Sequence, residues 1–269
     1  MAGFELPRII GHRGAASHAP ENTFASFRKA KALGTAWVEF DVRLTGDGRC
    51  ILLHDDTIDR TTDGRGAAAR MSLDVLTRFD AGAWFDPGFA GETIPTLEGT
   101  IDLLAELGLG ANVEIKPHRG AEIETAEAVC RILQTKWPAS LPAPLVSSFA
   151  YPALVAARRV APELARGLLL GRVGDDWRRL AEGIEARTVH CDHERLIRER
   201  VEEIRAAGYP VLAYTVNDAG RARELFDWGV CAVFSDAPDV VARAAPHDSS
   251  HRGECAGRGP GAAAGPAEF

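Results

Sequence analysis

The stretch VLAYTVNDAGRARELFDWGVCAVFSD, residues 211–236, contains one complete strand–helix–strand unit. Two apolar runs, Val211–Val216 and Val230–Phe234, have the length of buried strands, and the segment Ala219–Trp228 between them has the spacing of an amphipathic helix. Gly229 follows this segment, where glycine commonly ends a helix because the backbone turns left-handed there. A buried strand, a helix and a second buried strand in this order predict a parallel βαβ unit.

The same alternation extends upstream to about residue 111. Further strands are expected at Ala111–Ile115, Leu145–Ser148, Gly167–Leu170 and Thr188–Cys191, and helices at Ala121–Thr135, Pro152–Val160, Trp177–Glu182 and Arg195–Ala207. Two earlier strands, near Arg8–Gly11 and Trp37–Leu44, bring the pattern to eight βα units. Eight units in about 240 residues predict a TIM (β/α)8 barrel. The main alternative, an open doubly wound sheet, lacks a glycine-rich nucleotide loop after its first strand.

The alternation is interrupted once, between about His54 and Pro95. We predict a small cap insertion at about 56–95, after the second strand, where it would lie at the catalytic rim of the barrel. It contains the turn-rich residues 61–66 and a short helical segment, Ser72–Phe79. The barrel is expected to form a single domain over residues 1–245, and the Gly-, Ala-, Pro- and Ser-rich residues 246–269 a disordered tail.

The composition limits the class of protein. The chain has 269 residues and a net charge of −7, which gives no electrostatic basis for binding nucleic acid or an anionic membrane. Its first seven residues lack the features of a signal peptide, and no apolar run is long enough to cross a bilayer. The five cysteines have no zinc or redox spacing. We therefore expect a cytoplasmic protein with reduced, buried thiols and no membrane anchor; the oligomeric state is left open.

Acidic residues mark one strand face. Glu39 and Asp41 are two residues apart in a strand-like run, so both carboxylates project from the same face. They would repel each other and lose hydration unless a cation lay between them. Glu114 and Lys116 share a face of a later strand. They could belong to a functional site, or they could simply form ion pairs with neighbouring strands inside the barrel. Lysine is scarce in this chain, so Lys116 suggests a need for a compact ammonium near a phosphate or carboxylate.

Two histidines stand at strand ends. His12 follows the strand Arg8–Gly11, and His54 closes another apolar run, Cys50–Leu53. Each alone would more often be a hydrogen-bonded structural histidine. Together with the two carboxylates and Arg13, they indicate metal-assisted acid–base chemistry.

Several other polar residues allow two interpretations. Asn22 or Thr23 can cap the helix that follows, and a ligand role is equally compatible with the sequence. Arg60 belongs to a turn that is expected to anchor the cap; direct contact with the substrate is the less favoured interpretation. Tyr214 could line the pocket or pack in the core. Asp236 is expected to cap the last helix rather than to bind a metal.

In combination, these residues resemble the glycerophosphodiester phosphodiesterase family. Ordered motifs carry the resemblance over about residues 9–240: His12-Arg13-Gly14 with Pro20-Glu21-Asn22-Thr23, Glu39-Phe40-Asp41-Val42, His54-Asp55 with Arg60-Thr61-Thr62-Asp63-Gly64, Ile94-Pro95-Thr96-Leu97, Glu114-Ile115-Lys116-Pro117, Thr215-Val216-Asn217 and Ser235-Asp236-Ala237-Pro238. The resemblance implies a TIM barrel with a small inserted domain, in agreement with the pattern of strands and helices.

The resemblance also implies roles for individual residues. His12 and His54 would be the general acid and base, and Glu39, Asp41 and Glu114 would bind Mg²⁺ or Ca²⁺. Arg13 and Lys116 would contact the phosphate or the metal region. Tyr214 stands where a tryptophan is common in the family, and Ser235 where a threonine is common, so the substrate-side wall could differ.

The implied reaction is metal-dependent hydrolysis of a glycerophosphodiester, such as glycerophosphocholine or glycerophosphoethanolamine, to glycerol 3-phosphate and an alcohol. The resemblance is to the cytoplasmic bacterial type and suggests that a glycerol hydroxyl attacks phosphorus to give a cyclic phosphate. Two alternatives remain open. One is a lysophospholipase D-like or cyclising phosphodiesterase of the same barrel group, and the other is a non-catalytic ligand-binding barrel.

Overall fold

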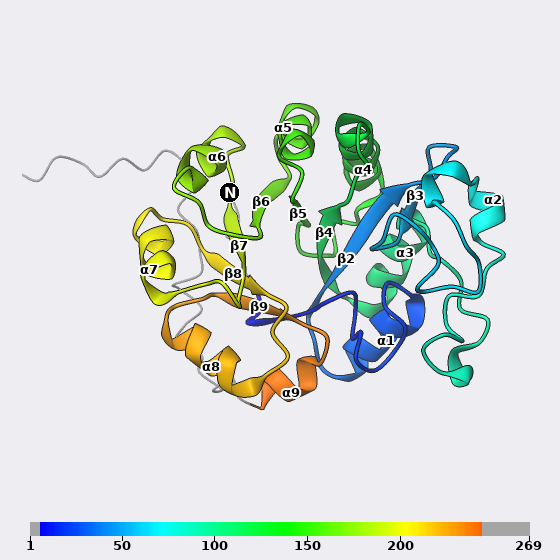
Figure 1. The fold of residues 1–269 in the computed structure, drawn as a ribbon, viewed down its shortest axis with the longest axis horizontal. Helices are drawn as coiled ribbons and strands as arrows, with labels where there is room; N and C mark the ends of the chain where they lie inside the picture. The colour runs from blue at the N-terminus through cyan, green and yellow to red at the C-terminus, as the bar shows by residue number, and fades with distance from the viewer. Residues whose placement is uncertain (1–5, 244–269) are drawn as a thin grey trace, which may run out of the picture.

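The computed structural model describes residues 6–243, in which parallel strands close into a barrel with helices on the outside (Figure 1). The eight barrel strands are β1 (Ile9–Gly11), β2 (Trp37–Leu44), β4 (Gly110–Ile115), β5 (Leu145–Ser148), β6 (Ala165–Leu170), β7 (Thr188–Asp192), β8 (Val211–Tyr214) and β9 (Ala232–Ser235). The barrel closes because β1 pairs in parallel with both β9 and β2. The predicted TIM barrel is confirmed.

A helix follows each barrel strand along the chain. These helices are α1 (Phe24–Ala32), α3 (Leu97–Leu107), α4 (Glu122–Lys136), α5 (Tyr151–Val160), α6 (Trp177–Gly183), α7 (Arg198–Ala206), α8 (Ala219–Asp227) and α9 (Pro238–Ala242). Short polar side chains begin several of them: Thr23, Thr96 and Asp218 each accept a hydrogen bond from a backbone N–H in the first turn. None of the helices in residues 6–243 is long and apolar enough to cross a membrane.

Some predicted bounds differ from the observed ones. Helix α7 begins at Arg198 rather than Arg195, because the N–H of Arg195 instead closes a turn on the carbonyl oxygen of Asp192. Strand β8 ends at Tyr214 rather than Val216, although the N–H of Val216 still donates to Phe234 on the neighbouring strand. The four cysteines in the described residues are buried, and burial raises the pKa of Cys50, Cys130 and Cys191 to about 12.

The two faces of β2 have different surroundings. Val38, Phe40 and Val42 are fully buried in the apolar layer between strands and helices. The alternate residues point into the barrel, where Trp37 packs in an apolar cluster with Ile10, Leu145, Leu212 and Phe234. Glu39 and Asp41 follow on the same face, closer to the C-terminal end of the strand. The interior is therefore apolar at one end and charged at the end where barrel active sites form.

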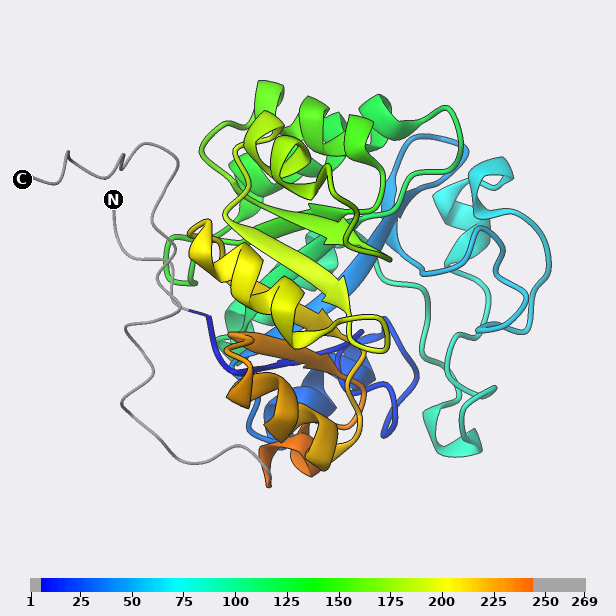
Figure 2. The ribbon, with the colours of Figure 1, turned by 60° about the vertical axis from the view of Figure 1, so that its left-hand side comes forward.

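The interruption in the alternation is a structured segment between β2 and α3. It starts with β3 (Cys50–Leu52), antiparallel to β2, and continues through η1 (Ala68–Arg70), α2 (Leu73–Leu76) and η2 (Pro87–Phe89). Its apolar side chains form a cluster of their own, and the segment lies beyond the C-terminal ends of the barrel strands (Figure 2). The predicted helix Ser72–Phe79 is shorter than expected. A capping role for residues 56–95 remains a prediction, and the expected tail at 246–269 lies outside the described residues.

Candidate active site

Three carboxylates meet inside the barrel. Glu39 and Asp41 come from β2, and the register between β2 and β4 places Glu114 directly opposite Asp41. All three side chains are buried, and one oxygen from each lies within 4.8 Å of the others. The structure therefore brings together the residues predicted as metal ligands.

The charge around these carboxylates is incompletely balanced. Lys116 Nζ lies 2.9 Å from Glu114 Oε1 and 3.3 Å from Asp41 Oδ1, and Arg13 Nε lies 3.3 Å from Asp41 Oδ2. Glu39 Oε1 is buried without a hydrogen-bond partner. Burial, followed by repulsion from Asp41, raises the pKa of Glu39 well above its usual value and that of Glu114 to about 7. A hard divalent cation would relieve this repulsion and use the unpartnered oxygen, so the three carboxylates fit such an ion.

His12 directly follows β1 and is held by a carboxylate from the next strand around the barrel. Its Nδ1 lies 2.7 Å from Asp236 Oδ1, and its Nε2 lies 3.8 Å from Glu39 Oε2. A carboxylate beside Nδ1 favours the proton on that nitrogen and leaves Nε2 facing the acidic residues. Burial raises the pKa of Asp236, but hydrogen bonds from His12 and Asn217 outweigh it and leave the value lowered.

The prediction that Asp236 caps the last helix is wrong. Helix α9 has Ala237 at its N-cap position and no side-chain capping bond. The Asp236 carboxylate instead accepts a 2.7 Å hydrogen bond from Asn217 Nδ2 and partners His12. Gly11 and Ser235 are paired between β1 and β9, so the residues that follow them, His12 and Asp236, emerge side by side.

His54 follows β3 and has an equivalent carboxylate partner. Its Nδ1 lies 2.7 Å from Asp55 Oδ1. Arg43 on β2 fixes the backbone here, with Nη2 donating to the His54 carbonyl at 2.6 Å and Nε to the Leu53 carbonyl at 3.1 Å. Burial is the largest influence on His54 and lowers its pKa, aided by the positive charges of Arg13 and Lys116. Lowering the pKa favours the neutral imidazole.

Two residues of the loop between β1 and α1 adopt left-handed backbone conformations, with φ of 49° at Arg13 and 57° at Asn22. Arg13 donates from its backbone N–H to Glu39 at 3.0 Å and from Nη1 to Glu21 at 2.7 Å. Asn22 is not the helix cap, a role that Thr23 has. Its side chain instead forms two hydrogen bonds with Asp41. Asn22 Nδ2 donates to the Asp41 carboxylate at 2.9 Å, and Asn22 Oδ1 accepts from the Asp41 backbone N–H at 3.2 Å.

A pair of aromatic rings, Phe149 and Tyr214, lies on the Lys116 side of the acidic cluster. Tyr214 is partly buried, its hydroxyl donates to the Leu170 carbonyl at 2.8 Å, and its ring meets that of Phe149 edge to face at 5.7 Å. Lys116 Nζ lies 5.7 Å from the centre of the same Phe149 ring, which is half exposed. Phe149 was not singled out from the sequence; its position directly after β5 was the available signal.

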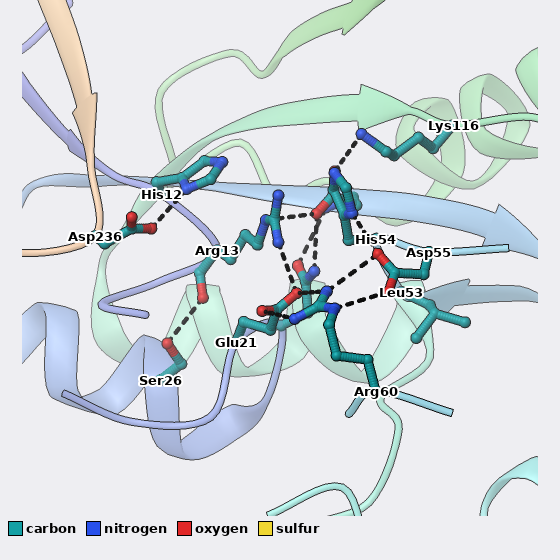
Figure 3. Close-up of polar contacts among 12 residues, drawn as sticks. His12, Arg13, Glu21, Ser26, Leu53, His54, Asp55, Arg60, Lys116 and Asp236 are labelled. Atoms are coloured by element: carbon teal, nitrogen blue, oxygen red, sulfur yellow. Dashed lines mark hydrogen bonds and ion pairs between the residues drawn. The ribbon is translucent and has the colours of Figure 1, made fainter. Parts of the chain in front are cut away.

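The predicted histidines, acidic residues and cations thus gather at one end of the barrel. Figure 3 shows some of their polar contacts: His12 is paired with Asp236, and a separate set of contacts joins Arg13, Glu21, Arg60, Asp55 and His54. Sequence reasoning did not foresee the parts played by Glu21, Asn22, Asp55, Asp236 and Asn217. All five belong to the motifs quoted from the sequence, but their partners depend on how loops meet across the barrel.

Comparisons with known proteins agree with this geometry. The model of the glycerophosphoryl diester phosphodiesterase family matches residues 12–240. A glycerophosphodiester phosphodiesterase of Caldanaerobacter subterraneus is 33% identical over 239 residues, which are 87% of this chain and 95% of the relative. A solved phosphodiesterase of Oleispira antarctica, in complex with the product sn-glycerol-3-phosphate, has a TM-score of 0.87 and 42% identity, covering 89% of this chain and 96% of the other.

A second solved structure, a glycerophosphodiester phosphodiesterase of Agrobacterium tumefaciens, has a TM-score of 0.71 and 28% identity over 88% of this chain and all of the other. The sequence match spans nearly the whole barrel and includes every residue of the acidic cluster and both histidines. The chain therefore belongs to the glycerophosphoryl diester phosphodiesterase family and is a phosphoric diester hydrolase.

Proposed function

We propose that this enzyme hydrolyses glycerophosphodiesters, such as glycerophosphocholine or glycerophosphoethanolamine, to glycerol 3-phosphate and an alcohol. The observation that carries the proposal is the pair of imidazoles, His12 and His54, each bound at Nδ1 by a carboxylate beside a buried acidic cluster. The product bound to the Oleispira antarctica phosphodiesterase supports the choice of substrate.

Glu39, Asp41 and Glu114 would hold Mg²⁺ or Ca²⁺, since hard cations prefer carboxylate oxygens. A bound divalent ion would supply a Lewis acid for a phosphoryl oxygen. The support is the cluster itself, together with the buried, unpartnered Oε1 of Glu39.

The cationic side chains would prepare the diester for attack. A phosphodiester resists nucleophiles because its anionic oxygens repel them. Arg13 can offer a planar fork to these oxygens, and Lys116 adds a point charge from β4. Tyr214 would line the substrate-side wall, next to Phe149.

The histidines would move the protons. One imidazole takes the proton of the neighbouring glycerol hydroxyl as its oxygen forms a bond to phosphorus. The other gives a proton to the alcohol oxygen as its bond to phosphorus breaks, which leaves a cyclic phosphate. Water then opens the ring to glycerol 3-phosphate, with the two imidazoles in exchanged roles. Each such proton transfer is worth roughly 10²–10⁴-fold in rate.

The direct test is release of glycerol 3-phosphate from glycerophosphocholine with Mg²⁺, with Ca²⁺ and with EDTA, followed by phosphorus NMR. We expect release with a metal, none with EDTA, and a transient cyclic phosphate. A cyclic phosphate that accumulates as the final product would identify a cyclising phosphodiesterase instead. No product with either metal, from a folded protein, would contradict the proposed substrate class.

A further inference from the structure

Arg60 forms two forked ion pairs with a single guanidinium group. Nη1 and Nη2 bind the two carboxylate oxygens of Glu21 at 2.6 and 2.8 Å. Nε and Nη2 bind the two oxygens of Asp55 at 2.7 and 3.1 Å (Figure 3). Arg60 lies in the segment that follows β3, whereas Glu21 lies in the loop between β1 and α1, so these bonds join two separate parts of the active-site rim.

Each of the two carboxylates also holds a residue of the candidate active site. Asp55 Oδ1 lies 2.7 Å from His54 Nδ1, and Glu21 Oε1 accepts from Arg13 Nη1 at 2.7 Å. Arg13 in turn lies beside Asp41 of the acidic cluster. An unbroken series of contacts therefore runs from His54 through Asp55, Arg60 and Glu21 to Arg13.

We propose that Arg60 is a positioning residue that fixes the placement of His54 relative to Arg13. The inference rests on the proposed function, in which these two side chains act on the same phosphodiester. Arg60 itself touches neither His54 nor Arg13 in the described contacts and acts through the two carboxylates. Such alignment matters because a displacement of about 1 Å in a reacting group can cost roughly 10²-fold in rate.

The chemistry of the side chain supports a geometric role. A guanidinium is planar and presents its donors in a rigid fork, so it can bind both oxygens of two carboxylates at once. An ammonium has the same charge but no fork. Burial raises the pKa of Glu21, but pairing with Arg60 and Arg13 outweighs it and leaves the pKa lowered. The hydrogen bond from Arg60 also lowers the pKa of Asp55, so both bridging carboxylates stay charged.

The competing explanation is an ordinary surface ion pair, which contributes only to stability and, when exposed, contributes little. The chain offers a matched control for it. Arg158 on α5 has the same side-chain exposure as Arg60, 44%, and lies 2.8 Å from Glu185 and from the Gly183 carbonyl, away from the acidic cluster.

The experiment compares Arg60→Met, Arg60→Lys and Arg158→Met in steady-state hydrolysis of glycerophosphocholine by the metal-loaded enzyme. We expect both Arg60 variants to lose roughly 10–100-fold in kcat with little change in KM, while Arg158→Met stays near wild type. Thermal unfolding should show similar, small losses for the two Met variants. Activity restored by Arg60→Lys would mean that charge alone suffices, and a rise confined to KM would mean direct substrate contact; either result would overturn the proposal.

A second measurement does not depend on turnover. Nitrogen-15 NMR of the imidazole rings reports which ring nitrogen carries the proton. In Arg60→Met we expect the His54 ring signals to shift or broaden, while those of His12, held by Asp236, stay unchanged. Unchanged His54 signals would contradict the role of Arg60. A wild-type enzyme that releases no glycerol 3-phosphate would contradict the proposed function instead, so the two failures can be told apart.

Discussion

At the scale of single residues, the candidate site depends on what lies next to each imidazole. His12 follows β1 and His54 follows β3, yet each has a carboxylate oxygen 2.7 Å from Nδ1. The carboxylate orients the ring, selects the tautomer and stabilises the imidazolium that forms during proton transfer. In the proposed mechanism, the two histidines would therefore be prepared for proton transfer in the same way, although their partners come from different elements.

We expect Asp236→Asn to lower kcat about 10²-fold, because the amide loses the charge that stabilises a protonated His12. The matched control is Asp239→Asn. Asp239 lies 2.7 Å from His18 Nε2 and has nearly the same side-chain exposure as Asp236, 24% against 25%, but its partner is not in the proposed catalytic pair. Steady-state kinetics and thermal unfolding of both variants provide the check. Equal losses in the two would show that the Asp236 pair is merely structural.

The buried side chain of His190 on β7 should make the stability of the fold depend on pH. It is fully buried beside Thr188 Oγ1, at 2.8 Å, and the Phe234 ring, and burial lowers its pKa to about 3. Because the folded pKa lies below the unfolded value of about 6.5, the unfolded chain binds the proton more readily between these two values. The contribution of neutral, buried His190 to the free energy of unfolding is therefore complete above about pH 6.5 and is lost as the pH falls toward 3.

Urea unfolding of wild type and His190→Asn at pH 7.5 and pH 5 tests this expectation. We expect the variant to be less stable at pH 7.5, since it loses packing against Phe234. When the pH falls from 7.5 to 5, the free energy of unfolding of the variant should decrease by about 2 kcal/mol less than that of wild type, because asparagine does not titrate. Equal losses in the two proteins would show that His190 does not contribute to the acid sensitivity.

At the scale of secondary-structure elements, strand β2 serves the core and the site at once. Its outward side chains, Val38, Phe40 and Val42, pack beneath the helices, while Glu39 and Asp41 face inward. The parallel register with β4 adds Glu114 opposite Asp41. A slip of one residue would exchange the two faces and bury the carboxylates under helices, so the same apolar packing that stabilises the strand also specifies the site.

Thermal unfolding with and without metal should show how far the buried, mutually repelling carboxylates destabilise the fold when no cation is bound. In EDTA we expect Glu39→Gln to be at least as stable as wild type, because it removes a buried carboxyl whose pKa is raised by burial and by its acidic neighbours. With Mg²⁺ or Ca²⁺ at about 100 times its Kd, wild type should gain about 5–10 °C in Tm and the variant little.

Glu98→Gln is the control for that experiment. Glu98 on α3 is partly exposed, lies 3.5 Å from Arg49 and is outside the acidic cluster. It should leave the response to metal unchanged. A full metal response in Glu39→Gln would remove Glu39 from the proposed ligand set.

At the scale of the whole molecule, an acidic protein has to bind an anionic substrate. The net charge is −7, and the three carboxylates of the cluster add negative potential at the site itself. Arg13 and Lys116 oppose it locally, one from the loop after β1 and one from the end of β4. A divalent cation would complete this reversal of the field, which is why the metal proposal and the substrate proposal depend on each other.

The closed barrel explains why part of this site was predictable and part was not. Barrel strands are buried on both faces, so their apolar runs stand out in the sequence, and carboxylates inside such a run are conspicuous. Glu39 and Asp41 share a strand face at a spacing of two residues, which local geometry alone requires. By contrast, His12 and Asp236 are 224 residues apart, and Arg60 and Glu21 are 39 apart.

The sequence by itself therefore determined the succession of strands and helices, the barrel they form, and the residue types at the strand ends. These follow from hydrophobic periodicity and from the short distances along one strand. Only the tertiary structure decided which carboxylate holds which histidine, that Asn22 binds Asp41 rather than capping a helix, and that Arg60 joins two loops. Those pairings depend on barrel closure and loop placement, which bring together side chains that no local spacing relates.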